Sequence, residues 1–190
     1  MMARFEPLVK HFNRYLTIGG FPELALSDDD LYAQRMLRED VVDKVIKRDV
    51  LTLFKVRSPL LMEKLFLYLC MNSTEIFSAT TAAKELDNIS PNTIESYVDA
   101  LVKSNLIYMA YPIAVGSKSV LKGRPKIYIA DAAIRNAVLM VDDVLSDERE
   151  LGLLIETTVY KHLVSFYQGT GAQLGYYRKA KKIKRGRCRN

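Results

Sequence analysis

Two Ser-Pro pairs, Ser58-Pro59 and Ser90-Pro91, constrain the fold of this chain more than any other feature of its sequence. Serine is a favoured helix N-cap and proline is favoured at the first helical position, so each pair predicts the start of a helix. The first of these helices runs to about residue 72 and is apolar nearly all round, which predicts a place in the core. The second carries one buried face at helical spacing, formed by Ile94, Tyr97, Val98, Leu101 and Val102.

The segments between and after these helices complete a recognisable order of elements. A short helix over residues 79–86 is capped by Ser78 and ends at a four-residue break before Ser90. Two strand-like runs rich in isoleucine and tyrosine follow, at residues 106–113 and 126–130, and a polar, basic segment joins them. Three helices, the last two separated by a tight turn, and then a hairpin predict a winged helix-turn-helix.

Helices are expected on both sides of this unit. Residues 4–17 predict a short amphipathic helix, and a long helix follows over about residues 31–55. On the other side, a helix over residues 132–140, a helix over about 150–167 and a strand at 174–178 are expected. The buried line of the helix over 150–167 is predicted to be Leu151, Ile155, Val159, Leu163 and Phe166.

These elements predict an α+β fold that is mainly α. We expect four parts along the chain. They are a helical linker (residues 1–57), a winged helix-turn-helix (58–130), an incomplete unit (131–177) and a basic tail (178–190). The third part has one long helix and one strand, which cannot bury a core, so its apolar surface predicts self-association or marginal stability.

The net charge of +6 comes from the C-terminal tail. From Arg178 onward the chain has eight basic residues and no acidic one. Removing these eight from the 28 basic residues of the whole chain leaves 20 against 22 acidic residues, a net charge of −2. Three interpretations of the tail stay open: a nucleic-acid-binding arm, a solvated disordered end, or a segment translated in the wrong frame.

Motifs for catalysis, cofactors and metals are missing from the sequence. It contains neither the G-x-x-x-x-G-K-[ST] loop nor G-x-G-x-x-G, and no serine in a G-x-S-x-G turn. His11 and His162 have no partner at zinc-ligand spacing, and Cys70 fits a small core residue better than a nucleophile. We therefore expect no catalytic residue, no bound metal and no cofactor, and the chain is predicted not to be an enzyme.

The location of the protein is predicted from similar absences. No apolar run approaches the roughly 20 residues of a membrane helix. The first residues, which include Arg4 and Glu6, hold no apolar signal segment, and two cysteines form no disulfide framework. A cytoplasmic protein without a membrane partner is expected.

The winged helix is a candidate for binding double-stranded DNA, because its third helix would enter the major groove and its hairpin loop would reach the backbone. The candidate nucleic-acid-binding residues are Asn92, Thr93, Ser96 and Lys103 on that helix, and Lys118, Lys122, Arg124 and Lys126 on the hairpin. Glu95 and Asp99, on the exposed side of the same helix, would repel phosphates. A protein-interaction or spacer module is therefore the alternative to DNA contact.

Six short motifs, spread over essentially the whole chain, carry a resemblance to a known family. The N-terminal ones are Tyr15-Leu16 with Gly19-Gly20-Phe21-Pro22-Glu23, then Lys47-Arg48-Asp49-Val50, then Ser90-Pro91-Asn92-Thr93-Ile94 with Tyr97. The C-terminal ones are Lys126-Ile127-Tyr128-Ile129 with Asp131, then Gly152 with Glu156, then Tyr176-Tyr177-Arg178. In order and spacing they resemble the region that follows the ATPase core in a prokaryotic AAA-type ATPase family, although Ala133 stands where that family usually has glycine.

This resemblance implies that the chain corresponds to the C-terminal part of such a protein, a domain of unknown function that joins a winged helix to a restriction-endonuclease-like fold. The P-loop motifs would lie upstream of Met1, so ATP binding is not carried over. Glu156 matches the helix glutamate of the nuclease-like fold, where carboxylates hold a divalent metal that activates water. The other carboxylates are missing after Arg178, so Glu156 is expected to be vestigial.

The resemblance also bears on the tail. The family typically continues with an EVDFV strand, where this chain has Arg185-Gly186-Arg187-Cys188-Arg189. These five residues can be encoded as AGA GGT CGA TGT CGT, which gives Glu-Val-Asp-Val-Val when it is read one base later. We therefore hypothesise a frameshift near residues 182–184.

Two functions remain as hypotheses. The first is a non-catalytic C-terminal fragment of an AAA-type ATPase whose winged helix binds nucleic acid or protein, including a separate ATPase subunit. The alternative is a stand-alone winged-helix DNA-binding regulator with a basic C-terminal arm.

Overall fold

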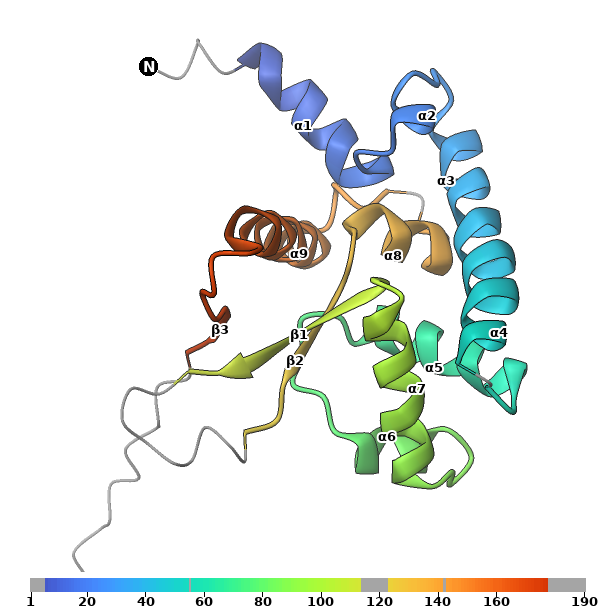
Figure 1. Ribbon diagram of the computed structural model, residues 1–190. Coiled ribbons are helices and arrows are strands. Elements are labelled where there is room, and N and C mark those ends of the chain that lie inside the picture. Colours follow the sequence, from blue (N-terminus) through green and yellow to red (C-terminus); the bar gives the residue numbers. More distant parts are fainter. Residues whose placement is uncertain (1–5, 55, 114–122, 142, 178–190) are drawn as a thin grey trace, which may run out of the picture.

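The computed structural model describes residues 6–54, 56–113, 123–141 and 143–177, and it shows a mainly helical α+β protein with a small sheet (Figure 1). The candidate nucleic-acid residues Lys118 and Lys122, and the basic tail, lie outside the described residues. The described helices are α1 (Glu6–Ile18), α2 (Pro22–Ala25), α3 (Asp30–Glu39), the π-helix η2 (Asp40–Val50), α4 (Leu51–Leu53), α5 (Pro59–Met71), α6 (Ala79–Glu85), α7 (Pro91–Lys103), α8 (Ala132–Leu139) and α9 (Glu148–Tyr167).

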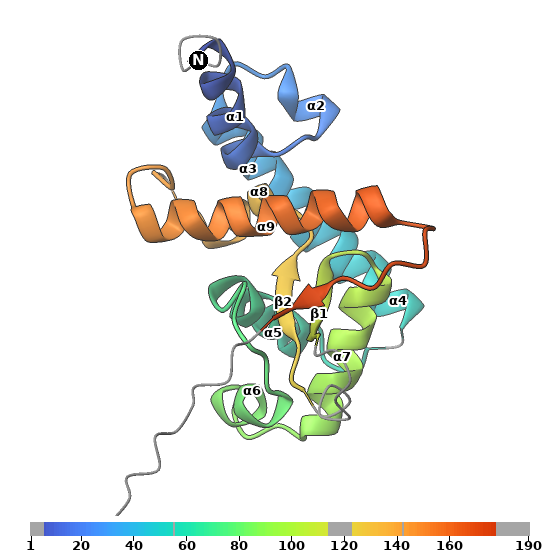
Figure 2. The same ribbon diagram turned by 90° about the vertical axis from the view of Figure 1, so that its left-hand side faces the viewer.

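The described sheet has three strands in the order β2-β1-β3. β1 (Ile107–Pro112) pairs antiparallel with β2 (Lys126–Ile129), with Ile107 opposite Ile129. β3 (Gly175–Tyr176) is short and lies parallel to β1, with Tyr111 opposite Gly175. The chain reaches β3 by way of α9, which lies across the molecule in Figure 2.

Most of the expected helices and strands are confirmed, because their ends carry strong local signals. The Ser58 hydroxyl accepts a hydrogen bond from the Leu61 amide at 3.3 Å, and Ser78 caps α6 in the same way. Ser90 differs, since its side chain makes no capping hydrogen bond. Its backbone is extended and Pro91 follows at the first helical position, so the proline alone accounts for the start of α7.

The long helix expected over residues 31–55 is present, but its middle is a π-helix. Helices α3, η2 and α4 follow one another without a break and form a single column in Figure 1. The Leu51 amide donates to the Ile46 carbonyl, five residues back, as a π-helix requires. The apolar spacing of this segment gives no sign of these wider turns.

One hydrophobic core connects the column, the middle helices and the sheet. It runs from Leu37 on α3 to Val138 on α8. As its apolar sequence predicts, α5 lies within this core, with Leu65, Phe66 and Leu69 almost completely buried. A second, smaller cluster of Leu16, Ala132, Val144 and Leu154 joins α1, α8 and α9.

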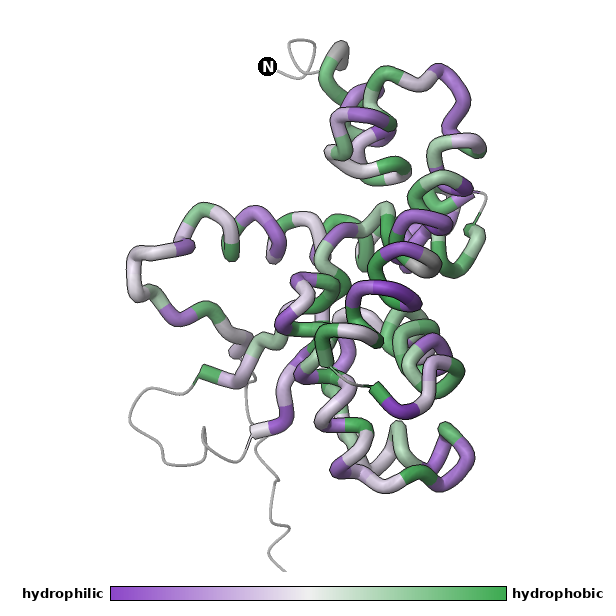
Figure 3. Tube along the Cα trace, turned by 45° about the vertical axis from the view of Figure 1, so that its right-hand side comes forward, coloured by the Kyte–Doolittle hydropathy of each residue, from purple (hydrophilic) through white to green (hydrophobic). Residues whose placement is uncertain are grey.

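The predicted buried line of α9 is wrong for four of its five residues; the fifth, Leu151, is half-buried and packs against the second cluster. Val159, Leu163 and Phe166 are 52%, 41% and 76% exposed, and Ile155 is 37% exposed. The buried residues of this helix are Leu154, Thr157 and Thr158. In Figure 3, α9 and the segment that leads into β3 project from the body and carry hydrophobic positions. The apolar stripe predicted for the core therefore faces outward.

Gly19, at the end of α1, is expected to tolerate no side chain. Its φ is +77°, and a Cβ there would lie 2.9 Å from Asp131 Oδ1 and 3.0 Å from the Ala133 Cβ. Gly19→Ala should therefore lower the free energy of unfolding by about 1–3 kcal/mol in a denaturant titration. Gly152→Ala is the matched control, because Gly152 lies inside α9 with open space around it, and it should stabilise by about 0.5–1 kcal/mol. Equal effects of the two variants would contradict this account.

Candidate functional site

Helix α7 carries four of the eight candidate nucleic-acid-binding residues. Ile94, Tyr97, Val98, Ala100 and Leu101 are buried, which turns the opposite side of the helix to solvent. Asn92 and Ser96 are exposed there, and Thr93 is half-buried. Lys103 is also exposed, but its Nζ lies 2.6 Å from Asp99 Oδ2 in an ion pair. The charge of Lys103 is therefore largely compensated within its own helix.

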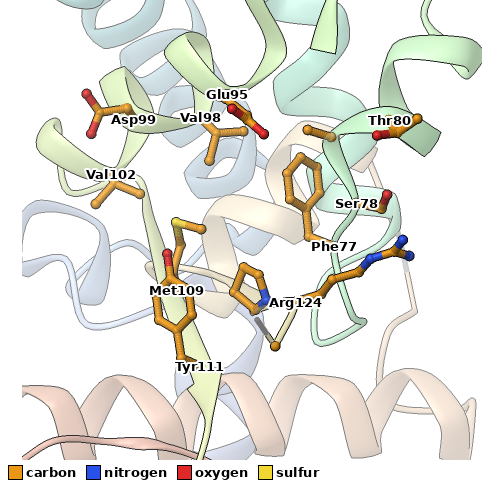
Figure 4. Close-up of a pocket in the computed structure, with 13 residues that line it drawn as sticks. Phe77, Ser78, Thr80, Glu95, Val98, Asp99, Val102, Met109, Tyr111 and Arg124 are labelled. Carbon is orange, nitrogen blue, oxygen red and sulfur yellow. The ribbon is translucent and has the colours of Figure 1, made fainter. Parts of the chain in front are cut away.

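A cleft of about 720 Å³ lies between this helix, the start of α6 and the β1–β2 hairpin. Figure 4 shows its lining, with α7 on one side and the segment around Phe77 and Arg124 on the other. Its apolar lining residues are Phe77, Ala79, Val98, Val102, Met109, Tyr111 and Pro125. The sequence did not single out this cleft, because its walls come from segments that are far apart in the chain.

Two acidic side chains, Glu95 and Asp99, stand along the α7 wall of the cleft. Asp99 is paired with Lys103, whereas the described residues offer Glu95 no ion-pair partner. Arg124 lines the opposite wall with an exposed side chain. The cleft thus combines an apolar lining with the Glu95 carboxylate, which has no ion-pair partner among the described residues.

The hairpin candidates Arg124 and Lys126 point to different neighbours. The Arg124 carbonyl accepts a hydrogen bond from the Tyr176 hydroxyl at 2.8 Å, and its side chain stays in the cleft. Lys126 Nζ lies 2.9 Å from Glu156 Oε1 on α9, and its side chain is only 25% exposed. Lys126 is therefore engaged away from the face that carries Asn92 and Ser96.

Glu156, the residue matched to a nuclease-like glutamate, is held by two donors. Its Oε1 accepts from Lys126 Nζ and, at 2.8 Å, from the Tyr128 hydroxyl. The Tyr128 ring stacks on Tyr160 with 4.1 Å between ring centroids. Burial, and secondarily the hydrogen bond to Glu156, raises the pKa of Tyr128. These contacts fasten α9 to β2.

The part of the chain that the structure describes holds no group of three or more His, Cys, Asp or Glu side chains able to bind a metal. Cys70 is completely buried, and burial raises the pKa of its thiol, so it forms little thiolate. Among the same residues, no helix has the length and apolar character needed to cross a bilayer.

Comparison with known proteins places this fold in a family. A family model described as "Domain of unknown function (DUF8612)" matches residues 9–145. The match covers well over half of the chain. The chain belongs to this family. The matched range includes the whole of the cleft and ends shortly before α9.

Two curated relatives of this DUF8612 protein come from Methanocaldococcus jannaschii. The uncharacterized protein MJ1637 is 30% identical over 172 residues, which are 89% of this chain and 35% of that protein. The uncharacterized protein MJ1544 is 25% identical over 160 residues, which are 82% of this chain and 34% of that protein. The DUF8612 chain therefore spans about a third of the length of these relatives. No solved structure matches it.

A second polar cluster joins α9 to the DUF8612 region. Asp131 caps α8 by accepting from the Ala133 amide at 2.9 Å, and its other oxygen accepts from Lys161 Nζ on α9. Lys161 Nζ also lies 3.2 Å from the Tyr15 hydroxyl, which lies 3.0 Å from Nε2 of His162. Burial lowers the pKa of Lys161, but Asp131 and Tyr15 together outweigh it and leave that pKa raised.

Stability of the DUF8612 protein should fall as the pH rises above about 10. The pKa values of Lys161 and Tyr128 are raised above their ordinary values of 10.5 and 10.0, so the folded state binds these protons more tightly than the unfolded state. The contribution of these two groups to stability is fully present below their ordinary pKa values. It is lost as the pH rises through their raised pKa values. Denaturant midpoints measured from pH 8 to 11 should therefore fall less steeply in Lys161→Met than in the exposed control Lys10→Met. Parallel curves would refute this role of Lys161.

Proposed function

We propose that this chain is a non-catalytic C-terminal module of a prokaryotic AAA-type ATPase family, and that its winged helix binds a protein segment. The winged helix comprises residues 58–130, and the segment would lie in the cleft between α7 and the β1–β2 hairpin. The observation that carries the proposal is the apolar cleft with Glu95 on its α7 wall, a carboxylate that no described residue pairs with.

Three features support the assignment to this module. The order of α5, α6, α7 and an antiparallel hairpin is the order of elements in a winged helix. The curated relatives are about three times as long as the matched region, which leaves room in them for an ATPase core. Four of the six motifs that resemble the ATPase family lie within residues 9–145, the range that the DUF8612 family model matches.

The engagement of Glu156 supports the non-catalytic part of the proposal. A nuclease-like site needs several carboxylates around one metal ion. Here the Glu156 carboxylate accepts from Lys126 and Tyr128, and the described residues hold no group of three or more His, Cys, Asp or Glu side chains that could bind a metal. Lys126 and Tyr128 use this carboxylate to hold α9 in place.

The charges around the cleft favour a protein over DNA. A groove-reading helix normally brings Arg or Lys to the duplex, whereas α7 presents Glu95 and an Asp99–Lys103 pair. An apolar segment with a lysine or arginine would fill the cleft and pair with Glu95. The partner we propose is therefore a short apolar and basic stretch of protein.

Peptide titration tests this directly. We expect a synthetic peptide of alternating leucine and lysine to shift the NMR signals of α7 and β1, and a leucine–glutamate peptide of equal length to leave them unchanged. Glu95→Gln should weaken binding by about fivefold, the effect of one exposed ion pair. Glu148→Gln, on the exposed start of α9, is the matched control and should bind normally. Binding of both peptides alike, or no effect of Glu95→Gln, would refute the proposal.

The alternative function is a DNA-binding regulator, which the exposed Asn92 and Ser96 at the start of α7 favour. This function requires that the winged helix itself binds double-stranded DNA at ~150 mM salt, where screened tail charges contribute little. Replacing the eight basic residues of the tail by glutamine separates the two contributions. Binding that disappears in this variant would exclude the regulator.

A further inference from the structure

A second cavity, of about 780 Å³, lies between α1 and α9, outside the cleft described above. Phe12 and Tyr15 of α1 form one wall, and Val159, Leu163 and Phe166 of α9 form the other. Among the described residues, His162, hydrogen-bonded to Tyr15, is the single imidazole in this lining, and no Asp, Glu, Lys or Arg lines the cavity. We call this cavity the α1–α9 groove.

The apolar surface of the groove continues along both helices. Leu8, Val9 and Phe12 of α1 are 58%, 51% and 45% exposed. On α9 the exposed stripe of Ile155, Val159, Leu163 and Phe166 extends to Tyr167. Eight large side chains of about 200 Å² each, exposed by about half, offer on the order of 800 Å² of apolar surface. Monomeric proteins seldom leave a contiguous apolar patch of this size in water.

The helix that carries this stripe cannot turn it inward. Lys126 and Tyr128 hold Glu156, and Asp131 holds Lys161, so the opposite side of α9 is fixed against β2 and α8. Rotating α9 to bury the stripe would break both polar clusters and would expose Leu154. Within the described fold the stripe therefore stays exposed.

We propose that the α1–α9 groove is a self-association surface, covered by the same groove of a second copy of this chain. Three observations favour this occupant. The exposed area is close to the roughly 800 Å² per partner of a standard interface. Phe166 is 76% exposed at the rim of an apolar groove. In a twofold dimer, Phe166 of each copy can enter the groove of the other copy.

Charge is the third observation. Residues 1–177 carry 20 basic and 22 acidic side chains, so the bodies of two copies repel each other little. The groove itself has no carboxylate, lysine or arginine that would lose its hydration on contact. A charged partner would form no ion pair with this lining. An identical apolar face would bury apolar surface along the whole groove.

The experiment measures the molar mass of the full chain by light scattering after gel filtration. We expect twice the monomer mass, and a melting temperature that rises with protein concentration. Phe166→Asp and Val159→Asp should each give the monomer mass and remove the concentration dependence. Leu26→Asp is the matched control, because Leu26 is 89% exposed at the end of α2, away from the groove, and it should remain dimeric.

Circular dichroism checks that the variants fold. We expect them to fold, because the substituted side chains are exposed. A monomer mass for the unsubstituted chain at every concentration up to ~100 µM would overturn the proposal, because such a dimer would bind more weakly than a standard interface does. A dimer that survives Phe166→Asp and Val159→Asp would overturn it as well. A loss of the dimer in Leu26→Asp would point to a different face and would also count against the α1–α9 groove.

Discussion

Glu150→Ala is expected to lower the free energy of unfolding by about 2–4 kcal/mol, one of the two largest effects predicted for this protein. Arg135 on α8 is 4% exposed, and its guanidinium donates to both carboxylate oxygens of Glu150, at 2.6 and 3.3 Å. Its third contact is the Cys70 carbonyl at 3.0 Å. Removing Glu150 leaves a buried cation with one neutral acceptor.

The expected loss of unfolding free energy lies toward the lower end of the range for a broken buried ion pair. The reason is that the Glu150 side chain is 29% exposed, so water can replace part of its interaction with Arg135. Denaturant titration of Glu150→Ala and of Glu148→Ala measures the difference, since Glu148 lies on the same turn of α9 and forms no ion pair with the residues that the structure describes. The double variant Arg135→Met/Glu150→Leu should recover much of the loss. A cost below ~1 kcal/mol for Glu150→Ala would show that the pair stabilises little.

Asp131→Ala is the second large effect, with an expected cost of about 3 kcal/mol. One carboxylate oxygen caps α8 through the Ala133 amide, and a lost cap costs about 1 kcal/mol. The other oxygen pairs with Lys161, and Asp131 is 6% exposed, so its loss leaves a half-buried ammonium with Tyr15 alone.

Asp131→Asn separates these two roles. Asparagine caps helices as well as aspartate does but carries no charge, so Asp131→Asn should lose the ion pair and keep the cap. We expect its cost, measured in the same denaturant titration, to be about 1 kcal/mol smaller than that of Asp131→Ala. Equal costs of the two variants would show that the side chain of Asp131 does not stabilise the start of α8.

The sequence predicts the elements of this fold well, because their ends depend on local chemistry. Prolines at the first helical position begin α5 and α7, Asp131 caps α8, and the isoleucine- and tyrosine-rich runs become β1 and β2. The π-helix η2 was not predicted, since Val41, Val45 and Ile46 also fit the period of an α-helix.

The orientation of α9 could not be predicted for a different reason. Its stripe from Ile155 to Phe166 has the spacing of a core-facing line, and spacing alone does not show which protein surface covers it. The other side is fixed by pairs that are 28 to 30 residues apart in sequence, Tyr128 with Glu156 and Lys126 with Glu156. Such contacts depend on how the hairpin and α9 are placed in three dimensions.

The candidate site was predicted in part. The exposure of Asn92, Glu95 and Ser96 on α7 follows from the helical period, and the structure shows Asn92, Glu95 and Ser96 exposed. The cleft beside them depends on Phe77, Met109 and Pro125, whose approach to α7 has no local signal in the sequence.

The most direct test of the proposed function is an NMR titration of the ¹⁵N-labelled full chain with duplex DNA of about 20 base pairs, enough for one such module, at ~150 mM salt. The proposal that α7 faces a protein segment predicts that any shifts are confined to the basic residues from Arg178 onward. Saturable shifts at Asn92, Thr93 and Ser96 would contradict it and would establish α7 as a DNA-binding helix.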